Sequence, residues 1–172
     1  MPAAQEITET LIRENIVRAA ANVFETMLRR PITLTGIVEP GSRAALARPD
    51  HPDAQVVGIV GFLGEVNGLI HLYFENTFAV ECTGLLLGLT AAEAAQAGDE
   101  TVNDAIGELS NMIVGGFKSG LCDSGLPCKL TVPSILRASD FRIEATRSAT
   151  RLIYLFDCSG RRVVAEIVMT KE

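Results

Sequence analysis

Long hydrophobic runs, a surplus of basic residues and proline- or serine-rich tracts are all missing from this sequence. The longest apolar stretch, residues 56–64, ends at Glu65 and is too short to cross a membrane. Lys and Arg number 15 against 21 Asp and Glu, a net charge of −6, whereas nucleic-acid affinity depends mainly on clustered basic side chains. The N-terminus shows no basic-then-apolar signal pattern. We therefore expect a cytoplasmic protein with no membrane or nucleic-acid partner.

Metal-ligand patterns are missing too. The two histidines, His51 and His71, have no neighbours typical of a metal site or a catalytic triad, and we expect one in a loop and the other in a strand. The four cysteines match no metal-ligand spacing, and we expect free thiols that pack as small buried or half-buried hydrophobes: Cys82, Cys122, Cys128 and Cys158. The sequence therefore predicts no metal and no cofactor in this chain.

What the chain does contain is enough apolar material for one core. Its 172 residues are 48 % hydrophobic and 21 % charged, which is typical of a single globular domain, here residues 1–172. Apolar residues at helical spacing predict a long amphipathic helix over residues 5–29, which Pro31 ends. A strand over 32–38 and a polar loop with several prolines over 39–54 follow.

Turn signals predict two groups of antiparallel strands. The pair Asn67-Gly68 separates two β-rich runs, residues 55–66 and 69–75, and is a strong signal for a hairpin turn. Near the C-terminus, Ser159-Gly160 predicts a tight turn within a meander of three strands over residues 140–147, 151–158 and 161–170.

Three helices are expected between these strand groups. A short helix over 76–88 opens with Asn76 or Thr77, and the capping-box spacing of Thr90 and Glu93 predicts a smaller helix that Gly98 closes. A longer helix begins near Thr101. Because strands and helices occur in blocks and do not alternate, the order favours an α+β fold with an antiparallel sheet and helices packed on it.

The first and last long helices suggest an internal repeat. Shifting the first helix by 89 residues keeps its apolar positions, and Asn22 falls on Asn111 while Ala19 falls on Glu108. The prediction is two pseudo-symmetric helix-plus-strands repeats, the first over about 5–75 and the second over about 98–170, sharing one sheet. Since the first helix has the amide but lacks the acid, we expect its copy of the site to be degenerate.

The last long helix carries the most informative residues. At about 100° per residue its large apolar side chains form one stripe, which we expect to face the core: Val102, Ile106, Leu109, Ile113 and Phe117. The opposite face carries a second stripe: Asp104, Glu108, Asn111 and Gly115. Glu108 and Asn111 are neighbours there, because residues three apart lie on one side of a helix.

Three glycines interrupt this helix. Each costs about 1 kcal/mol relative to alanine in a helix interior, so Gly107, Gly115 and Gly116 need a structural reason. Gly115 continues the polar stripe, where a missing side chain leaves room for a partner beside the amide. Gly107 and Gly116 are candidates for close packing inside the fold.

These residues resemble a known family. The stretch NDAIGELSNMIVGGFK (103–118) is similar to the signature of the CheC, CheX and FliY group of bacterial chemotaxis phosphatases, in which an Asp or Ser, a Glu, an Asn and a Gly recur at this spacing. GEVNGLIHLYFENTFAVECTGLLLG (64–88), FETML (24–28) and VPSI (132–135) also fit. One intact Glu-x-x-Asn pair makes the chain look CheX-like, although Gly116 and the long 39–54 loop depart from relatives.

The resemblance implies hydrolysis of the phospho-aspartate on a CheY-type response regulator in chemotaxis. In this reading Asn111 positions the attacking water, Glu108 docks on the receiver's active-site lysine, and Asp104 and Gly115 contact the partner. The Mg²⁺ belongs to the partner's receiver domain, and a homodimer of this chain is expected.

Two other interpretations remain open from the sequence. The chain could be a non-catalytic docking module that binds a receiver domain or a flagellar-switch component, because a fold alone does not determine function. It could also be an unrelated α+β domain in which Glu108 and Asn111 are buried or lie on different faces.

Overall fold

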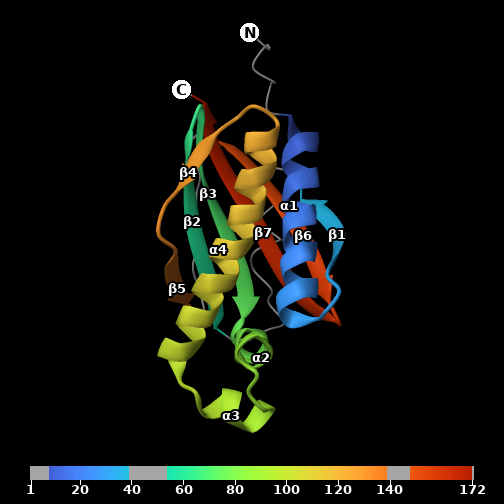
Figure 1. Ribbon diagram of the computed structural model, residues 1–172, viewed down its shortest axis with the longest axis vertical. Helices are drawn as coiled ribbons and strands as arrows, with labels where there is room; N and C mark the ends of the chain where they lie inside the picture. The colour runs from blue at the N-terminus through green and yellow to red at the C-terminus, as the bar shows by residue number, and fades with distance from the viewer. Residues whose placement is uncertain (1–7, 39–53, 139–147, 172) are drawn as a thin grey trace.

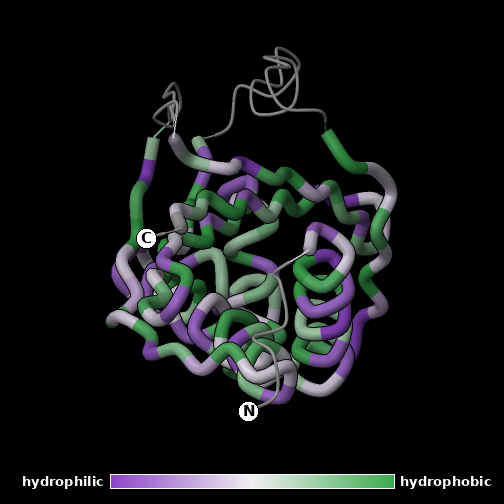
Figure 2. The backbone as a smooth tube through the Cα atoms, turned by 90° about the horizontal axis from the view of Figure 1, so that it is seen from above, coloured by the Kyte–Doolittle hydropathy of each residue, from purple (hydrophilic) through white to green (hydrophobic). Residues whose placement is uncertain are grey.

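The computed structural model describes residues 8–38, 54–138 and 148–171. One seven-stranded antiparallel sheet carries the two long helices side by side on one of its faces, and the two shorter helices lie at one end of the sheet (Figure 1). Seen along the molecule, the helices form one layer beside the strands (Figure 2). The α+β class and the antiparallel sheet expected from the sequence are confirmed.

The first helix, α1 (Glu9–Val23), is capped by Thr8, whose side-chain oxygen accepts from the Leu11 amide at 3.1 Å. It continues into a π-helical turn, η1 (Phe24–Leu28), and ends where Arg29 adopts a left-handed conformation with φ 54°. This agrees with the predicted helix over 5–29, of which residues 5–7 lie outside the described part.

Three helices follow the first strands: α2 (Asn76–Leu87), α3 (Ala91–Gln96) and α4 (Asp99–Asp123). The predicted capping box is confirmed, since Thr90 and Glu93 exchange both hydrogen bonds. The predicted helix over 76–88 is confirmed, since α2 begins at Asn76, and its N-cap residue, Glu75, makes no side-chain capping hydrogen bond. No described helix is long and apolar enough to cross a membrane.

The sheet contains seven strands, all in antiparallel pairs: β1 (Thr33–Val38), β2 (Gln55–Gly64), β3 (Val66–Glu75), β4 (Cys128–Leu130), β5 (Ser134–Ala138), β6 (Thr150–Cys158) and β7 (Arg161–Lys171). The short strands β4 and β5, which both pair with β2, were not predicted. The strand expected over 140–147 lies outside the described residues, as do residues 39–53 of the loop expected over 39–54, including His51.

The first hairpin turns earlier than its Asn-Gly pair predicted. Phe62 pairs with Gly68, so the chain reverses around Glu65, and Asn67 and Gly68 belong to β3. The physical reason is local: the Asn67 side-chain oxygen accepts from the Gly64 amide at 3.1 Å, and a Cβ on Gly68 would lie 2.4 Å from the Phe62 ring. Asn67 and Gly68 therefore stabilise the hairpin as the second and third residues of β3, and they do not form its turn.

The second hairpin follows its prediction. Ser159 and Gly160 connect β6 to β7 with φ values of 51° and 83°, the two left-handed positions of a type I′ turn. Its strands provide the centre of the sheet, where β7 pairs with β3 across the boundary between the two predicted repeats.

The strand order is β1-β6-β7-β3-β2-β4, with β5 as a further partner of β2. The first predicted repeat thus contributes the hairpin β2–β3 and the strand β1, which pairs with β6. The second contributes the hairpin β6–β7 and the short strands β4 and β5, which both pair with β2. The duplication itself, with its boundaries near 5–75 and 98–170, stays a prediction.

The core lies between the helices and the sheet, and α4 packs closely on β2. Phe62 and Phe117 meet edge to face with ring centroids 5.6 Å apart. Farther along, a Cβ on Gly58 would lie 1.9 Å from the Ser110 hydroxyl oxygen, so only glycine allows the helix to approach the strand there. These contacts leave the opposite side of α4 facing outward.

Candidate functional site

The apolar stripe of α4 is buried as predicted. All five of its residues are at most 2 % exposed: Val102, Ile106, Leu109, Ile113 and Phe117. The helix can start abruptly because Gly98, its N-cap residue, has φ 85°, a value that favours glycine. Asp99 and Glu100 in the first turn complement the helix dipole.

The polar stripe faces outward, so the interpretation in which Glu108 and Asn111 are buried or lie on different faces is wrong. Asp104 and Glu108 are exposed, and Asn111 and Gly115 are half-buried. Within the described residues, the side chains of Asp104, Glu108 and Asn111 have no hydrogen-bond or ion-pair partner. The structure therefore presents a free carboxylate and a free amide, one helical turn apart.

The three helical glycines have different surroundings. A Cβ on Gly115 would meet nothing within 4 Å, so the surface beside Asn111 is open. A Cβ on Gly116 would lie 3.0 Å from the Cβ of Ala19, which identifies Gly116 as the close contact between α4 and α1. At Gly107 the nearest atom, on Ile135, would be 4.0 Å away, an ordinary contact.

The equivalent part of α1 offers no second site. Ala19, which the repeat aligns with Glu108, is buried against Gly116, while Asn22 is exposed. The first helix thus has an amide on its surface, but it has alanine where α4 has Glu108 and no open glycine beside the amide.

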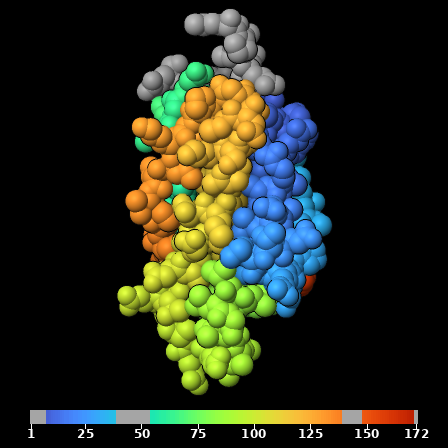
Figure 3. All heavy atoms as spheres, in the orientation of Figure 1, coloured from blue at the N-terminus to red at the C-terminus, as the bar shows by residue number. Residues whose placement is uncertain are grey.

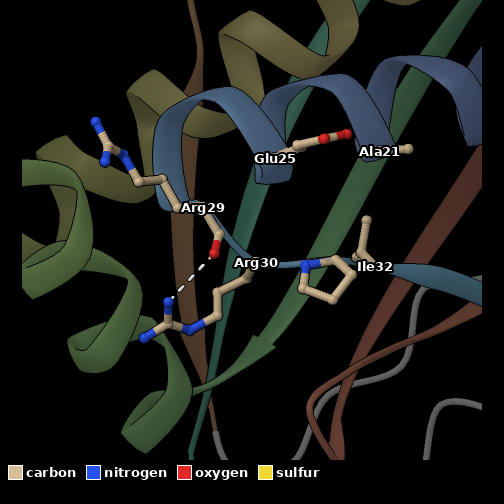
Figure 4. A pocket seen from close by; sticks show the side chains of 6 residues that line it. Ala21, Glu25, Arg29, Arg30 and Ile32 are labelled. Carbon is tan, nitrogen blue, oxygen red and sulfur yellow. Dashed lines mark hydrogen bonds between the residues drawn. The ribbon is translucent and has the colours of Figure 1, made fainter.

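The site lies on the open surface of a helix. The outward side of α4 forms an open strip between α1 and the β4–β5 segment (Figure 3). A surface pocket of about 400 Å³ lies elsewhere, at the end of the first helix, and is lined by Ala21, Glu25, Arg29, Arg30, Pro31 and Ile32. Its charged groups do not converge, because the Arg29 and Arg30 guanidinium groups point away from Glu25 (Figure 4).

The thiols follow their prediction with one exception. Cys82, Cys128 and Cys158 are buried, but Cys122 is exposed at the end of α4, and all four are free. Burial raises the pKa of the Cys82, Cys128 and Cys158 thiols, which disfavours their reactive thiolate forms. Among the described residues no group of His, Cys, Asp and Glu could hold a metal ion.

A buried polar cluster lies across the central strands β3 and β7. Glu166, fully buried, accepts from the Tyr73 hydroxyl at 3.0 Å, forms an ion pair with Arg151, and lies 3.3 Å from His71 Nδ1. Burial alone would raise the pKa of Glu166, but the His71, Arg151 and Tyr73 contacts outweigh it and lower that pKa. His71 is in a strand, as predicted, and this cluster supports the fold.

A second polar cluster lies at the start of α4. Arg137 on β5 donates hydrogen bonds to Asn103 of α4, to Asn76 of α2 and to the Asp99 carbonyl. Nothing in the sequence pattern indicates this contact, since 34 residues separate Arg137 from Asn103.

Known proteins share the sequence pattern and the fold of this chain. The family model described as "Chemotaxis phosphatase CheX" matches residues 56–157. No curated relative matches the chain. Among solved structures, a CheC-like superfamily protein from Shewanella sp. PV-4 aligns with a TM-score of 0.75 and 23 % identity over 94 % of this chain and 99 % of that chain.

Two further structures have the same fold. A chemotaxis protein CheX from Desulfovibrio desulfuricans gives a TM-score of 0.73 at 21 % identity, covering 91 % of this chain and 97 % of that chain. CheX from a Borrelia burgdorferi complex with CheY, BeF3 and Mg gives a TM-score of 0.69 at 20 % identity, covering 92 % of this chain and 97 % of that chain. Since the family model spans more than half of the sequence, the chain belongs to the CheX family of chemotaxis phosphatases.

Proposed function

We propose that this chain hydrolyses the phospho-aspartate of a CheY-type response regulator and so shortens a chemotactic signal. The observation that carries the proposal is the pair Glu108 and Asn111, unpartnered within the described residues and one turn apart on the outward face of α4. Membership of the CheX family and the likeness to a CheX protein that was crystallised with CheY support this choice of partner.

A site on the open surface of a helix suits this reaction. An acyl phosphate held in a receiver domain lies beside that receiver's own Mg²⁺, so an added catalyst needs only to position water and to complement charge. A helix that presents two polar side chains can enter the receiver's active site, whereas a pocket would have to enclose a whole domain. The open surface at Gly115 leaves space for the receiver beside Asn111.

Asn111 is assigned to the water. Its carboxamide can accept one hydrogen bond from a water molecule and donate another, so it can align the water for in-line attack on phosphorus without becoming charged. The water's oxygen forms the new bond to phosphorus, the bond from phosphorus to the aspartyl oxygen breaks, and the products are inorganic phosphate and the free carboxylate.

Glu108 is assigned to docking. Its carboxylate would pair with the active-site lysine of the receiver, and such a charge-assisted bond holds the helix in register. Asp104, one turn earlier, adds negative charge at the edge of the same contact. Arrangement as a homodimer and the absence of a cofactor in this chain remain further predictions.

The test is phosphate release from a labelled response regulator with Asn111→Ala. We expect the acceleration to fall by on the order of 10²-fold, because water is no longer aligned. Asn22→Ala removes a comparable exposed amide from α1 and serves as the matched control, with full activity expected.

Two results would contradict the proposal. If Asn111→Ala releases phosphate as fast as the wild type, the amide does not position the water. If the wild-type chain binds the phosphorylated regulator without shortening its lifetime, the chain is a docking module, the alternative function left open by the sequence.

A further inference from the structure

The first two turns of α4 bury Val102 and Ile106 in the core, and one polar side chain, Arg137 on β5, adds hydrogen bonds to the start of the helix. Its Nε donates to the side-chain oxygen of Asn103. Its two terminal nitrogens donate to the Asn76 side-chain oxygen at 3.0 Å and to the Asp99 carbonyl at 3.3 Å. One guanidinium thereby connects β5, the first residue of α2 and the start of α4.

Arg137 acts here more through directed hydrogen bonds than through its charge. The Asp99 carboxylate lies 3.5 Å from Arg137 but is 81 % exposed, so solvent weakens that ion pair. A cation near a helix N-terminus also opposes the helix dipole. What Arg137 supplies is a rigid, planar set of donors, which the side chains of Asn103 and Asn76 accept from fixed directions.

The two halves of α4 are held in different ways. Its C-terminal half is fixed by close packing, because Gly116 touches Ala19 of α1 and Gly120 lies beside Asn15. Near its N-terminus, Gly107 makes only an ordinary contact with Ile135 of β5. Val102 and Ile106 anchor these turns in the core, and the hydrogen bonds of Arg137 add fixed directions to that apolar packing.

We propose that Arg137 is a positioning residue for the site. Acting through Asn103, it holds the N-terminal half of α4 so that Glu108 is already oriented for docking on the receiver. This inference rests on the proposed function, and its reason is preorganisation: a group held in its bound orientation loses less freedom on binding. Asn111, a turn farther along and next to the closely packed half, depends on Arg137 less.

The first test uses Arg137→Met, which keeps the aliphatic stem and removes every donor. We expect KM for the phosphorylated regulator to rise roughly tenfold while kcat changes by less than about threefold, as for a lost docking orientation. The conservative variant Arg137→Lys should recover part of the loss, since it keeps the charge but not the planar fork.

Arg161→Met is the matched control. Arg161 also joins a strand to a helix, because it donates to Thr77 of α2 at 3.1 Å and lies over the Phe78 ring, but none of these contacts involves α4. We expect a similar loss of stability and an unchanged KM. An equal rise in KM for both variants would overturn the proposal, since a general loosening of the fold would then explain it.

A second measurement does not depend on catalysis. Amide hydrogen exchange in the free protein should become faster over residues 99–108 in Arg137→Met and in Asn103→Ala, but not over 111–121, and the double variant should add little. Unchanged exchange over 99–108 would overturn the proposal. If the wild type releases no phosphate, the proposed function fails. The role of Arg137 is still tested by the amide hydrogen exchange and by the affinity of each variant for a receiver loaded with beryllofluoride and Mg²⁺.

Discussion

Gly116 of α4 lies directly against Ala19 of α1, so that a Cβ added to Gly116 would stand 3.0 Å from the Ala19 Cβ. Its neighbour Gly115 faces outward, with nothing within 4 Å of an added Cβ. Two adjacent positions of one helix thus require glycine for opposite reasons. One allows two helices to approach, and the other keeps a surface bare.

The adjacent glycines predict opposite effects on stability. Gly115→Ala should raise the free energy of unfolding by up to about 1 kcal/mol, because alanine favours the helix and nothing obstructs its methyl group. Gly116→Ala should lower it by about 1 kcal/mol, because the Ala19 methyl group cannot rotate away and overpacking exceeds the gain in propensity. Urea unfolding of both variants measures the difference, and an equal stabilisation would show that the helices separate freely.

The bare surface at Gly115 also predicts a loss of docking without a loss of fold. Gly115→Leu adds a side chain beside Asn111, where we propose that the receiver approaches, and leucine is a good helix former. We expect unchanged or higher stability and an affinity for the phosphorylated regulator lower by about tenfold, or about 1.4 kcal/mol. Titration of labelled regulator measures this, and undiminished affinity would place the contact elsewhere on the molecule.

The assigned roles of Glu108 and Asn111 predict different kinetic defects. Glu108→Gln keeps the shape of the side chain but removes the charge that we propose pairs with a lysine, so KM should rise about tenfold with kcat largely kept. The variant should also show a weaker dependence of KM on salt than the wild type. Glu14→Gln, at an exposed position on α1, is the control. A fall in kcat alone would transfer the chemical role to Glu108.

The buried Glu166 predicts a pH-dependent stability. Its pKa is lower in the folded chain than the ordinary value near 4.3, so the ionised carboxylate stabilises the fold above that value and the contribution is lost as the pH falls through the folded pKa. Glu166→Gln should therefore lower the free energy of unfolding by about 3 kcal/mol at neutral pH, because the Arg151 charge loses its partner.

At acid pH the free energies of unfolding of Glu166→Gln and of the wild type should differ less than at neutral pH. Denaturant unfolding at neutral pH and below about pH 4 measures both proteins under the two conditions. If the two proteins differ in free energy of unfolding by the same amount at both pH values, the ionised form of Glu166 does not stabilise the fold. Activity at neutral pH serves as a separate readout, and we expect the folded fraction to keep it, since the cluster does not include α4.

Local patterns in the sequence determined much of the helix that carries the site. The 3.6-residue period placed Ile106 and Phe117 in the core and Glu108 and Asn111 outside, because a helix has a fixed rotation per residue. The capping box at Thr90 and the left-handed turn at Ser159-Gly160 were also predictable, since both depend on the chemistry of neighbours along the chain.

Only the tertiary structure decided the remaining features, because each depends on how side chains pack between strands and helices. The first hairpin turns at Glu65, in part because Gly68 must lie beneath the Phe62 ring. The difference between Gly115 and Gly116 depends on where α1 lies, and the contact of Arg137 with Asn103 requires β5 to pair with β2 beside α4. Periodicity describes one helix at a time, whereas these contacts come from how the elements pack together.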